Sequence, residues 1–255
     1  MTLAEEGEPL AYDIAFSFAE EEPDLRALEA RSREVAPKLR ALALIVLLTR
    51  ADVARFRGNL RAAAELRRDY LRAARQAASL QEAGREFAAG RAAGLFDALA
   101  AGAFELAREI VVLEPAEWRP DCEYEDDFCW ARLVALALDA DRPAGTQAPR
   151  LLERFESSLQ GEASARLDLA RALAQGDAAA FGQAFEALLE ERGREIEERI
   201  EAGEMDDPLV LAARRVHVEG LALLALADAR GWPTEREYLY CPSMARNGPG
   251  AGAAA

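Results

Sequence analysis

The sequence is poor in the residues from which strands and disulfide frameworks are built. Aromatic residues make up only 7% of the 255 residues, and β-branched residues are sparse, so the types that favour strands are scarce. Ala, Leu, Glu and Arg, which are strong helix formers, dominate instead. The three cysteines are an odd number and do not make a disulfide framework. These shortages predict an all-α protein of the reducing cytoplasm.

Lysine and long apolar runs are also missing. Lys38 is the single lysine among 31 basic residues, and 46 acidic residues bring the formal net charge to −15. Such a field repels nucleic acid and anionic membranes and attracts basic partners, although it also serves solubility. The longest apolar run, residues 39–48, is far shorter than the ~20 residues that span a bilayer. The first residues carry no secretion signal, so we expect a cytoplasmic protein without membrane contact.

Helical periodicity extends over nearly the whole chain. It predicts about nine to ten helices, packed as antiparallel pairs in an irregular bundle or a short α-solenoid. The expected helices cover residues 10–20, 24–48 with a bend at Pro37, 52–74, 82–100, 103–114, 125–139, 147–159, 162–175, 177–201 and 206–230. Glycines between several of them are natural helix ends.

A Pro- and Gly-containing stretch at residues 139–149 is the best internal linker. It divides the chain into an N-terminal lobe, residues 1–139, and a C-terminal lobe, residues 150–242, which we expect to pack together as one domain. The aromatic segment after residue 230 is expected to pack back across the bundle and close the core. The Gly- and Ala-rich residues 243–255 are expected to form a disordered tail.

Motifs of known enzyme classes are absent from the sequence. There is no phosphate-binding Gly-rich loop before Lys-Ser/Thr, no dinucleotide fingerprint and no Gly-x-Ser-x-Gly elbow. The only histidine, His217, has no serine or cysteine beside it in sequence and is interpreted as structural. Cys122, Cys129 and Cys241 could join it in a zinc site, but their spacing matches no zinc motif. We therefore predict no catalytic residues, no metal, no cofactor and no enzyme activity.

The most unusual local feature is an acidic and aromatic run before the helix expected at residues 125–139. Carboxylates at a helix N-terminus offset the helix dipole, but one or two would suffice. A metal site would need carboxylates from a second helix, and none is evident. Aromatic anchors ringed by charge are typical of binding hot spots, so partner contact is the other interpretation. The candidate partner-binding residues are Trp118, Asp121, Glu123, Tyr124, Glu125, Asp126 and Asp127.

Three segments carry a resemblance to a known family. They are Trp118–Phe128, Val218–Asp228 and Tyr238–Pro242, in a chain whose order of helices is also similar. Over about residues 30–242 the chain resembles the Imm49 immunity proteins of bacterial polymorphic toxin systems, the immunity protein 49 family. The resemblance implies an all-helical, non-catalytic antitoxin that binds a cognate toxin domain and blocks it by occlusion. It carries over no binding residues, because immunity interfaces differ with the toxin.

A basic nuclease is one toxin class that suits the charge, because nucleases hold phosphates and a −15 chain could imitate their substrate. The alternative interpretation is a helical-repeat scaffold or adaptor without a toxin partner. The absence of a fixed-period repeat weighs against a scaffold of that kind.

Overall fold

The computed structural model describes residues 3–17, 23–79, 82–138, 147–203 and 208–246, and the chain in these ranges is helical. The prediction of an all-α fold is confirmed, and within these ranges no strand occurs beyond one isolated bridge between Tyr238 and Cys241. The elements are α1 (Leu3–Phe16), α2 (Leu25–Ala30), the π-helix η1 (Arg31–Val35), α3 (Ala36–Arg50), α4 (Val53–Ala74), α5 (Ala93–Ala100), α6 (Phe104–Leu113), α7 (Glu125–Ala137), α8 (Gln147–Ser158), α9 (Ala165–Gln175), α10 (Ala178–Glu201), α11 (Pro208–Ala213), α12 (Val218–Ala229) and α13 (Ser243–Arg246).

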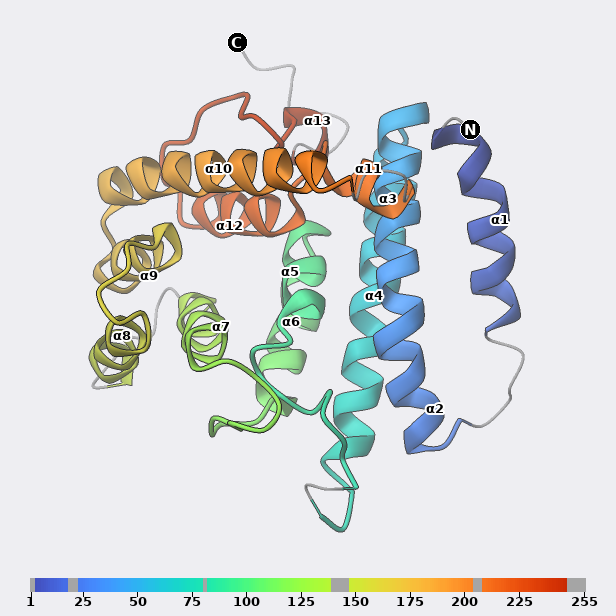
Figure 1. Ribbon diagram of the computed structural model, residues 1–255, viewed down its shortest axis with the longest axis horizontal. Coiled ribbons are helices and arrows are strands. Elements are labelled where there is room, and N and C mark those ends of the chain that lie inside the picture. The colour runs from blue at the N-terminus through green and yellow to red at the C-terminus, as the bar shows by residue number, and fades with distance from the viewer. Residues whose placement is uncertain (1–2, 18–22, 80–81, 139–146, 204–207, 247–255) are drawn as a thin grey trace.

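The helices pack around one continuous core (Figure 1). α3 and α4 lie side by side with α1 against α3, and α5 and α6 pack on α4. α7, α8 and α9 form a group on the other side of α5 and α6, and α10 and α12 cross above them. α12 packs on α5, so buried residues from both halves of the chain share the same core. Residues 139–146 of the expected linker lie outside the described residues, and the two lobes stay a prediction.

Polar caps set several helix starts where the sequence indicates them. Asp24, Asp52, Ser164 and Asp177 each precede a helix, and each side chain accepts a hydrogen bond from a backbone N–H of the first turn. Gly176 ends α9 at a φ of 73°, in the left-handed region that glycine enters without strain. The first helix is displaced from its predicted place: α1 covers Leu3–Phe16 rather than residues 10–20.

The helix expected at residues 82–100 begins only at residue 93, and residues 82–92 form turns. The carbonyl groups of this segment accept hydrogen bonds from side chains outside it, in place of the backbone hydrogen bonds of a helix. Arg67 donates to the carbonyls of Glu86 and Ala88, and Arg119 donates to those of Gly84 and Phe87. The sequence pattern misses this because both arginines lie far from the segment in sequence.

The helix expected at residues 206–230 is divided into α11 and α12 by residues 214–217. At the break the backbone N–H of His217 donates to the carbonyl of Tyr240 at 2.8 Å. The returning C-terminal segment closes the core as predicted. Trp232 meets Phe181 edge-on with ring centroids 5.3 Å apart, and Tyr238 meets Phe185 at 5.0 Å.

The expected disordered tail does not begin at residue 243, because Ser243–Arg246 form α13. The guanidinium of Arg246 holds this helix in place through Asp228, Thr234 and the carbonyl of Glu235. The rest of the expected tail, residues 247–255, lies outside the described residues. None of the described helices is both long enough and apolar enough to cross a membrane.

A close contact of α12 gives a first testable prediction. A Cβ added at Gly220 would lie 2.7 Å from Sγ of the fully buried Cys241 and 3.2 Å from Nδ1 of His217. We expect Gly220→Ala to lower the free energy of unfolding by about 1–3 kcal/mol, because the packed core must shift to admit a methyl group. Urea unfolding measures the loss. Gly182→Ala on α10, where nothing lies within 4 Å of the added Cβ, is the control, and an equal loss there would contradict the packing account.

Candidate partner-binding face

The predicted acidic run straddles the start of α7. Tyr124 is the N-cap residue and provides no side-chain hydrogen bond, while Glu125, Asp126 and Asp127 occupy the first turn. Carboxylates there interact favourably with the positive end of the helix dipole. Behind them Phe128 and Trp130 are buried in the core, which fixes the side of α7 that faces outward.

Three of the seven predicted residues, Trp118, Glu123 and Glu125, form hydrogen bonds or ion pairs within the protein. The Glu123 carboxylate accepts the backbone N–H groups of Gly90 and Arg119, so it ties the turns at 82–92 to the segment before α7. The indole N–H of Trp118 donates to the Glu123 carbonyl at 3.2 Å. Burial raises the pKa of Glu123 above its usual range, while these two amides oppose the rise.

Glu125 also has a structural partner. Its carboxylate pairs with Arg154 of α8. The Arg154 guanidinium lies 4.9 Å from the ring centroid of Trp118 and 5.4 Å from that of Phe128, so it is held between two aromatic rings. Trp118, Glu123 and Glu125 are therefore contacts that shape the face rather than free groups on it.

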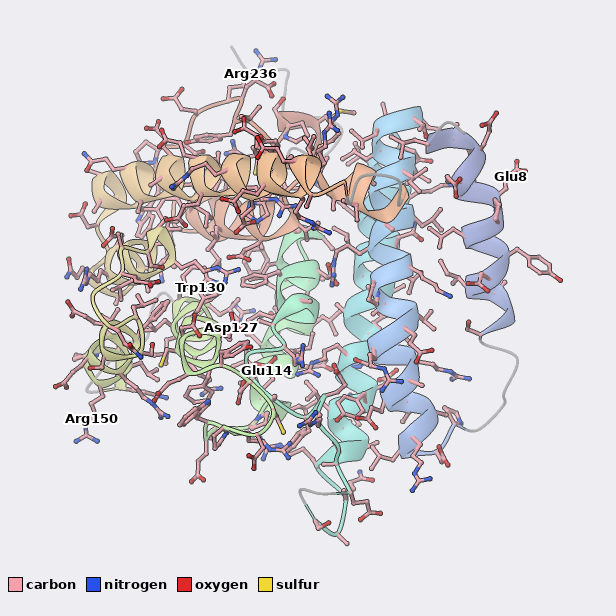
Figure 2. The ribbon with its side chains drawn as sticks, in the orientation of Figure 1. Glu8, Glu114, Asp127, Trp130, Arg150 and Arg236 are labelled. Carbon is pink, nitrogen blue, oxygen red and sulfur yellow. The ribbon has the colours of Figure 1, made fainter. Side chains whose placement is uncertain are left out.

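Of the remaining predicted residues, Asp121 and Tyr124 are exposed, and Asp126 and Asp127 are partly buried. Tyr124 is 79% exposed, Asp121 is exposed, and Asp126 makes no ion pair with any described residue. Asp127 lies near Trp130 on α7 in Figure 2, and its Oδ1 atom is 3.5 Å from Nη1 of Arg166. Burial and then the neighbouring Asp126 raise the pKa of the Asp127 carboxyl. We call the surface that carries Asp121, Tyr124, Asp126 and Asp127 the acidic face.

Two polar hollows adjoin these residues. The first, which we call the Tyr124 hollow, has a volume of about 380 Å³. It is lined by Arg85, Gly90, Arg91, Pro120, Asp121, Cys122, Glu123, Tyr124 and Asp127. The second, the His217 hollow, has a volume of about 300 Å³ and opens beside Asp126. Its other lining residues are Phe155, Ser164, Arg166, Leu188, Glu191, Arg192, Glu195, His217 and Glu219.

A hydrogen-bonded network links the helices that surround the His217 hollow. The Arg166 guanidinium donates twice to the Glu219 carboxylate, at 2.9 and 2.7 Å, and the Trp130 indole N–H donates to the same carboxylate at 3.1 Å. These residues come from α7, α9 and α12, so one carboxylate joins three helices. A two-pronged contact of this kind fixes both partners in position.

His217 is uncharged at neutral pH. Burial lowers the pKa of its imidazole to about 4, with Glu219 opposing the change. Its Nδ1 atom is buried and has no hydrogen-bond partner within the described ranges. The His217 imidazole lies near Cys241 and lines the hollow, and its interpretation as a structural residue stays a prediction.

The hollow contains no arrangement of a nucleophile and a base among the described residues. The Ser164 hydroxyl accepts the N–H of Leu167 as an N-cap, and no described hydrogen bond joins it to His217. Burial raises the pKa of the Cys129 and Cys241 thiols to about 12, which keeps both protonated. In the same described ranges no three His, Cys, Asp or Glu side chains are grouped as metal ligands.

Sequence reasoning found the acidic run but missed its partners. Arg154, Arg166, Glu191, Glu195 and Glu219 come from four other helices, and nothing in their local sequence sets them apart from ordinary surface charges. Only the spacing of Glu191 and Glu195, one helical turn apart, indicates that they share a face.

Comparison with known proteins decides the family. The model of the immunity protein 49 family, Imm49, matches residues 78–245, about two thirds of the chain. The chain belongs to the immunity protein 49 family. The match confirms the resemblance drawn from the sequence, although it begins at residue 78 and not near residue 30. No curated protein matches the chain, and no solved structure does. All residues of the acidic face and its two hollows fall inside the segment that matches Imm49.

Proposed function

We propose that this Imm49 protein is an immunity protein that binds a toxin domain at the acidic face and blocks it by occlusion, without chemistry of its own. Membership of the family is the observation that carries the proposal. The choice of face is supported by the position of the exposed Tyr124 and the unpaired Asp126 between two hollows.

The charges around the two hollows favour a basic partner. Carboxylates outnumber guanidiniums in the combined lining of the two hollows. The chain as a whole has a net charge of −15. A field of this sign speeds the encounter with a basic protein and disfavours anionic ones. Tyr124 provides an aromatic group of the kind that anchors interfaces. A toxin that binds phosphate groups, such as a nuclease, has a basic surface that complements the charge of the acidic face.

The protection itself is tested by co-expression. A toxin domain encoded beside this gene is expressed alone and together with the protein, and growth of the host is followed. We expect growth to be restored only when the protein is present. Failure to restore growth against the neighbouring toxin would remove the immunity function and favour the scaffold alternative.

The place of binding is tested by changing only outward-facing residues. The triple variant Asp121→Asn, Tyr124→Ala, Asp126→Asn removes two charges and the exposed ring without touching the ion pairs of Glu125 and Asp127. We expect its affinity for the toxin to fall by about a hundredfold or more, because an anchoring ring and charged contacts are lost together. Calorimetric titration against the purified toxin measures the change.

A matched control carries the same kind of changes elsewhere. Glu8→Gln and Tyr12→Ala on α1, with Glu105→Gln on α6, also remove two charges and an exposed tyrosine. Glu8 lies across the molecule from α7 (Figure 2). If the control weakens binding as much as the first variant, the acidic face is not the interface, whether or not the protein protects cells.

A further inference from the structure

A third hollow lies on the opposite flank of the turns at 82–92, and its charge is opposite to that of the chain. Its volume is about 340 Å³. It lies where α4 and the start of α5 meet η1 and the start of α3, and we call it the arginine hollow. Its lining residues are Ser32, Arg33, Ala36, Pro37, Arg40, Ala63, Arg67, Glu86, Gly90, Arg91, Ala92, Ala93 and Gly94.

The arginine hollow gathers four guanidinium groups, of which two are paired with carboxylates. Glu86 is the single carboxylate in its lining. Arg40 is offset by Asp97 behind it, and Arg33 pairs at the surface with Glu34. The other two arginines, 67 and 91, have no carboxylate within ion-pair distance among the described residues. In a chain of net charge −15 this is a local excess of positive charge.

Arg67 provides the strongest indication of a ligand. Its side chain is only 3% exposed and lines the hollow. Two of its nitrogens donate to the neutral carbonyls of Glu86 and Ala88, while its buried Nε has no described partner. A buried cation whose partners are all neutral is costly unless an anion comes close. The buried Glu114 carboxylate offsets part of the Arg67 charge through space, but it forms no described hydrogen bond with the guanidinium.

The start of α5 supplies backbone donors to the same hollow. No side chain caps Ala92, and none of the described hydrogen bonds takes up the N–H groups of Ala93 and Gly94, which line the hollow. Gly94 lets this helix end approach Arg67 closely, because an added Cβ would lie 2.6 Å from the Arg67 Cβ. Free amides at a helix N-terminus beside guanidiniums are the chemistry that binds anions.

We propose that the arginine hollow binds a phosphate group, either as free phosphate or as the ester of a small molecule. A tetrahedral anion presents oxygens to the helix end and to the guanidiniums at the same time, whereas a carboxylate presents two oxygens in one plane. The arginine hollow is distinct from the acidic face, because much of its lining precedes residue 78, where the family match begins, although Gly90 and Arg91 line both it and the Tyr124 hollow.

The test is a calorimetric titration of the whole chain at constant ionic strength, with inorganic phosphate and glycerol phosphate as probes. We expect saturable binding to one site. Ala93→Glu places a carboxylate at the exposed first position of α5 and should weaken binding at least about tenfold. Ala93→Gln has nearly the same size without the charge and should keep most of the affinity. Arg91→Gln, at an exposed residue, should also weaken binding, whereas Arg150→Gln on the distant α8 should not.

Each outcome decides for or against the site. Tighter binding of the ester supports a small-molecule ligand, and tighter binding of inorganic phosphate supports the free ion. The proposal is overturned if neither probe binds, or if binding is unchanged in both Ala93→Glu and Arg91→Gln. Acetate binding as tight as phosphate would overturn the assignment to a tetrahedral anion.

Discussion

Replacing Arg40 by methionine is expected to destabilise the protein by about 3–5 kcal/mol. Asp97 lies on α5 with no exposed surface, and its two carboxylate oxygens accept hydrogen bonds from Arg40 at 2.6 and 2.5 Å. Removing the guanidinium leaves a carboxylate buried between helices without a partner. Burial already raises the pKa of Asp97 while Arg40 opposes the rise, so the variant should raise it further.

That change in pKa has a defined sign. A carboxyl whose pKa is raised on folding favours the folded state at low pH, and this contribution is lost as the pH rises through the folded-state value. Arg40→Met should therefore lose more stability at about pH 8 than at about pH 5. Urea unfolding at the two pH values measures both effects. The control is Arg40→Met combined with Asp97→Leu, which replaces the pair by apolar groups and should recover most of the stability. A double variant no more stable than the single one would mean that packing and not the buried charge dominates.

Glu114→Gln is expected to change the pH dependence of stability by about 3 kcal/mol. Glu114, labelled in Figure 2, is 1% exposed, and burial raises its pKa from 4.5 to about 7 despite the nearby charges of Arg67 and Arg132. The wild-type carboxyl thus favours folding below about pH 4.5 and loses that contribution as the pH rises to about 7. Glutamine does not titrate, so the variant should gain stability relative to the wild type over that interval.

The measurement is the difference in unfolding free energy between variant and wild type at about pH 4.5 and about pH 8. His217 titrates with the opposite sign, because burial lowers its pKa to about 4 and its contribution is lost as the pH falls. Taking the difference removes this term, since both proteins keep His217. Glu105→Gln is the control, because the Glu105 side chain is 89% exposed and remains solvated on folding. A difference that stays constant with pH in Glu114→Gln would show that the buried carboxyl does not titrate in this interval.

The helical class and most helix ends could be predicted because they depend on neighbours in sequence. Asp52 and Asp177 cap helices through N–H groups two or three residues away, and this pattern is visible in the sequence. The turns at 82–92 could not be predicted in the same way. Their carbonyls bond to Arg67 and Arg119, at separations of 19 to 35 residues, and local propensity contains no record of such partners.

The same distinction between local and long-range contacts applies to the candidate site. The acidic run is visible in the sequence, and the contact of its outward residues with a partner stays a prediction. Trp118, Glu123 and Glu125 hold the structure together, while Asp121, Tyr124 and Asp126 face outward. Whether a residue of the run makes internal contacts or faces outward depends on Arg154 and Gly90. Tertiary packing brings these two residues next to the run. The hollows themselves are a product of tertiary structure.

Arg91 lines both the Tyr124 hollow and the arginine hollow, and Gly90 does the same while its N–H holds Glu123. The Arg91 guanidinium cannot bind an anion in the arginine hollow and offset the carboxylates of the Tyr124 hollow with equal strength. An anion that draws Arg91 away would leave the acidic face more negative and strengthen its attraction for a basic partner. By thermodynamic linkage a bound basic partner would strengthen anion binding to the same extent, so occupancy of one surface would set the affinity of the other.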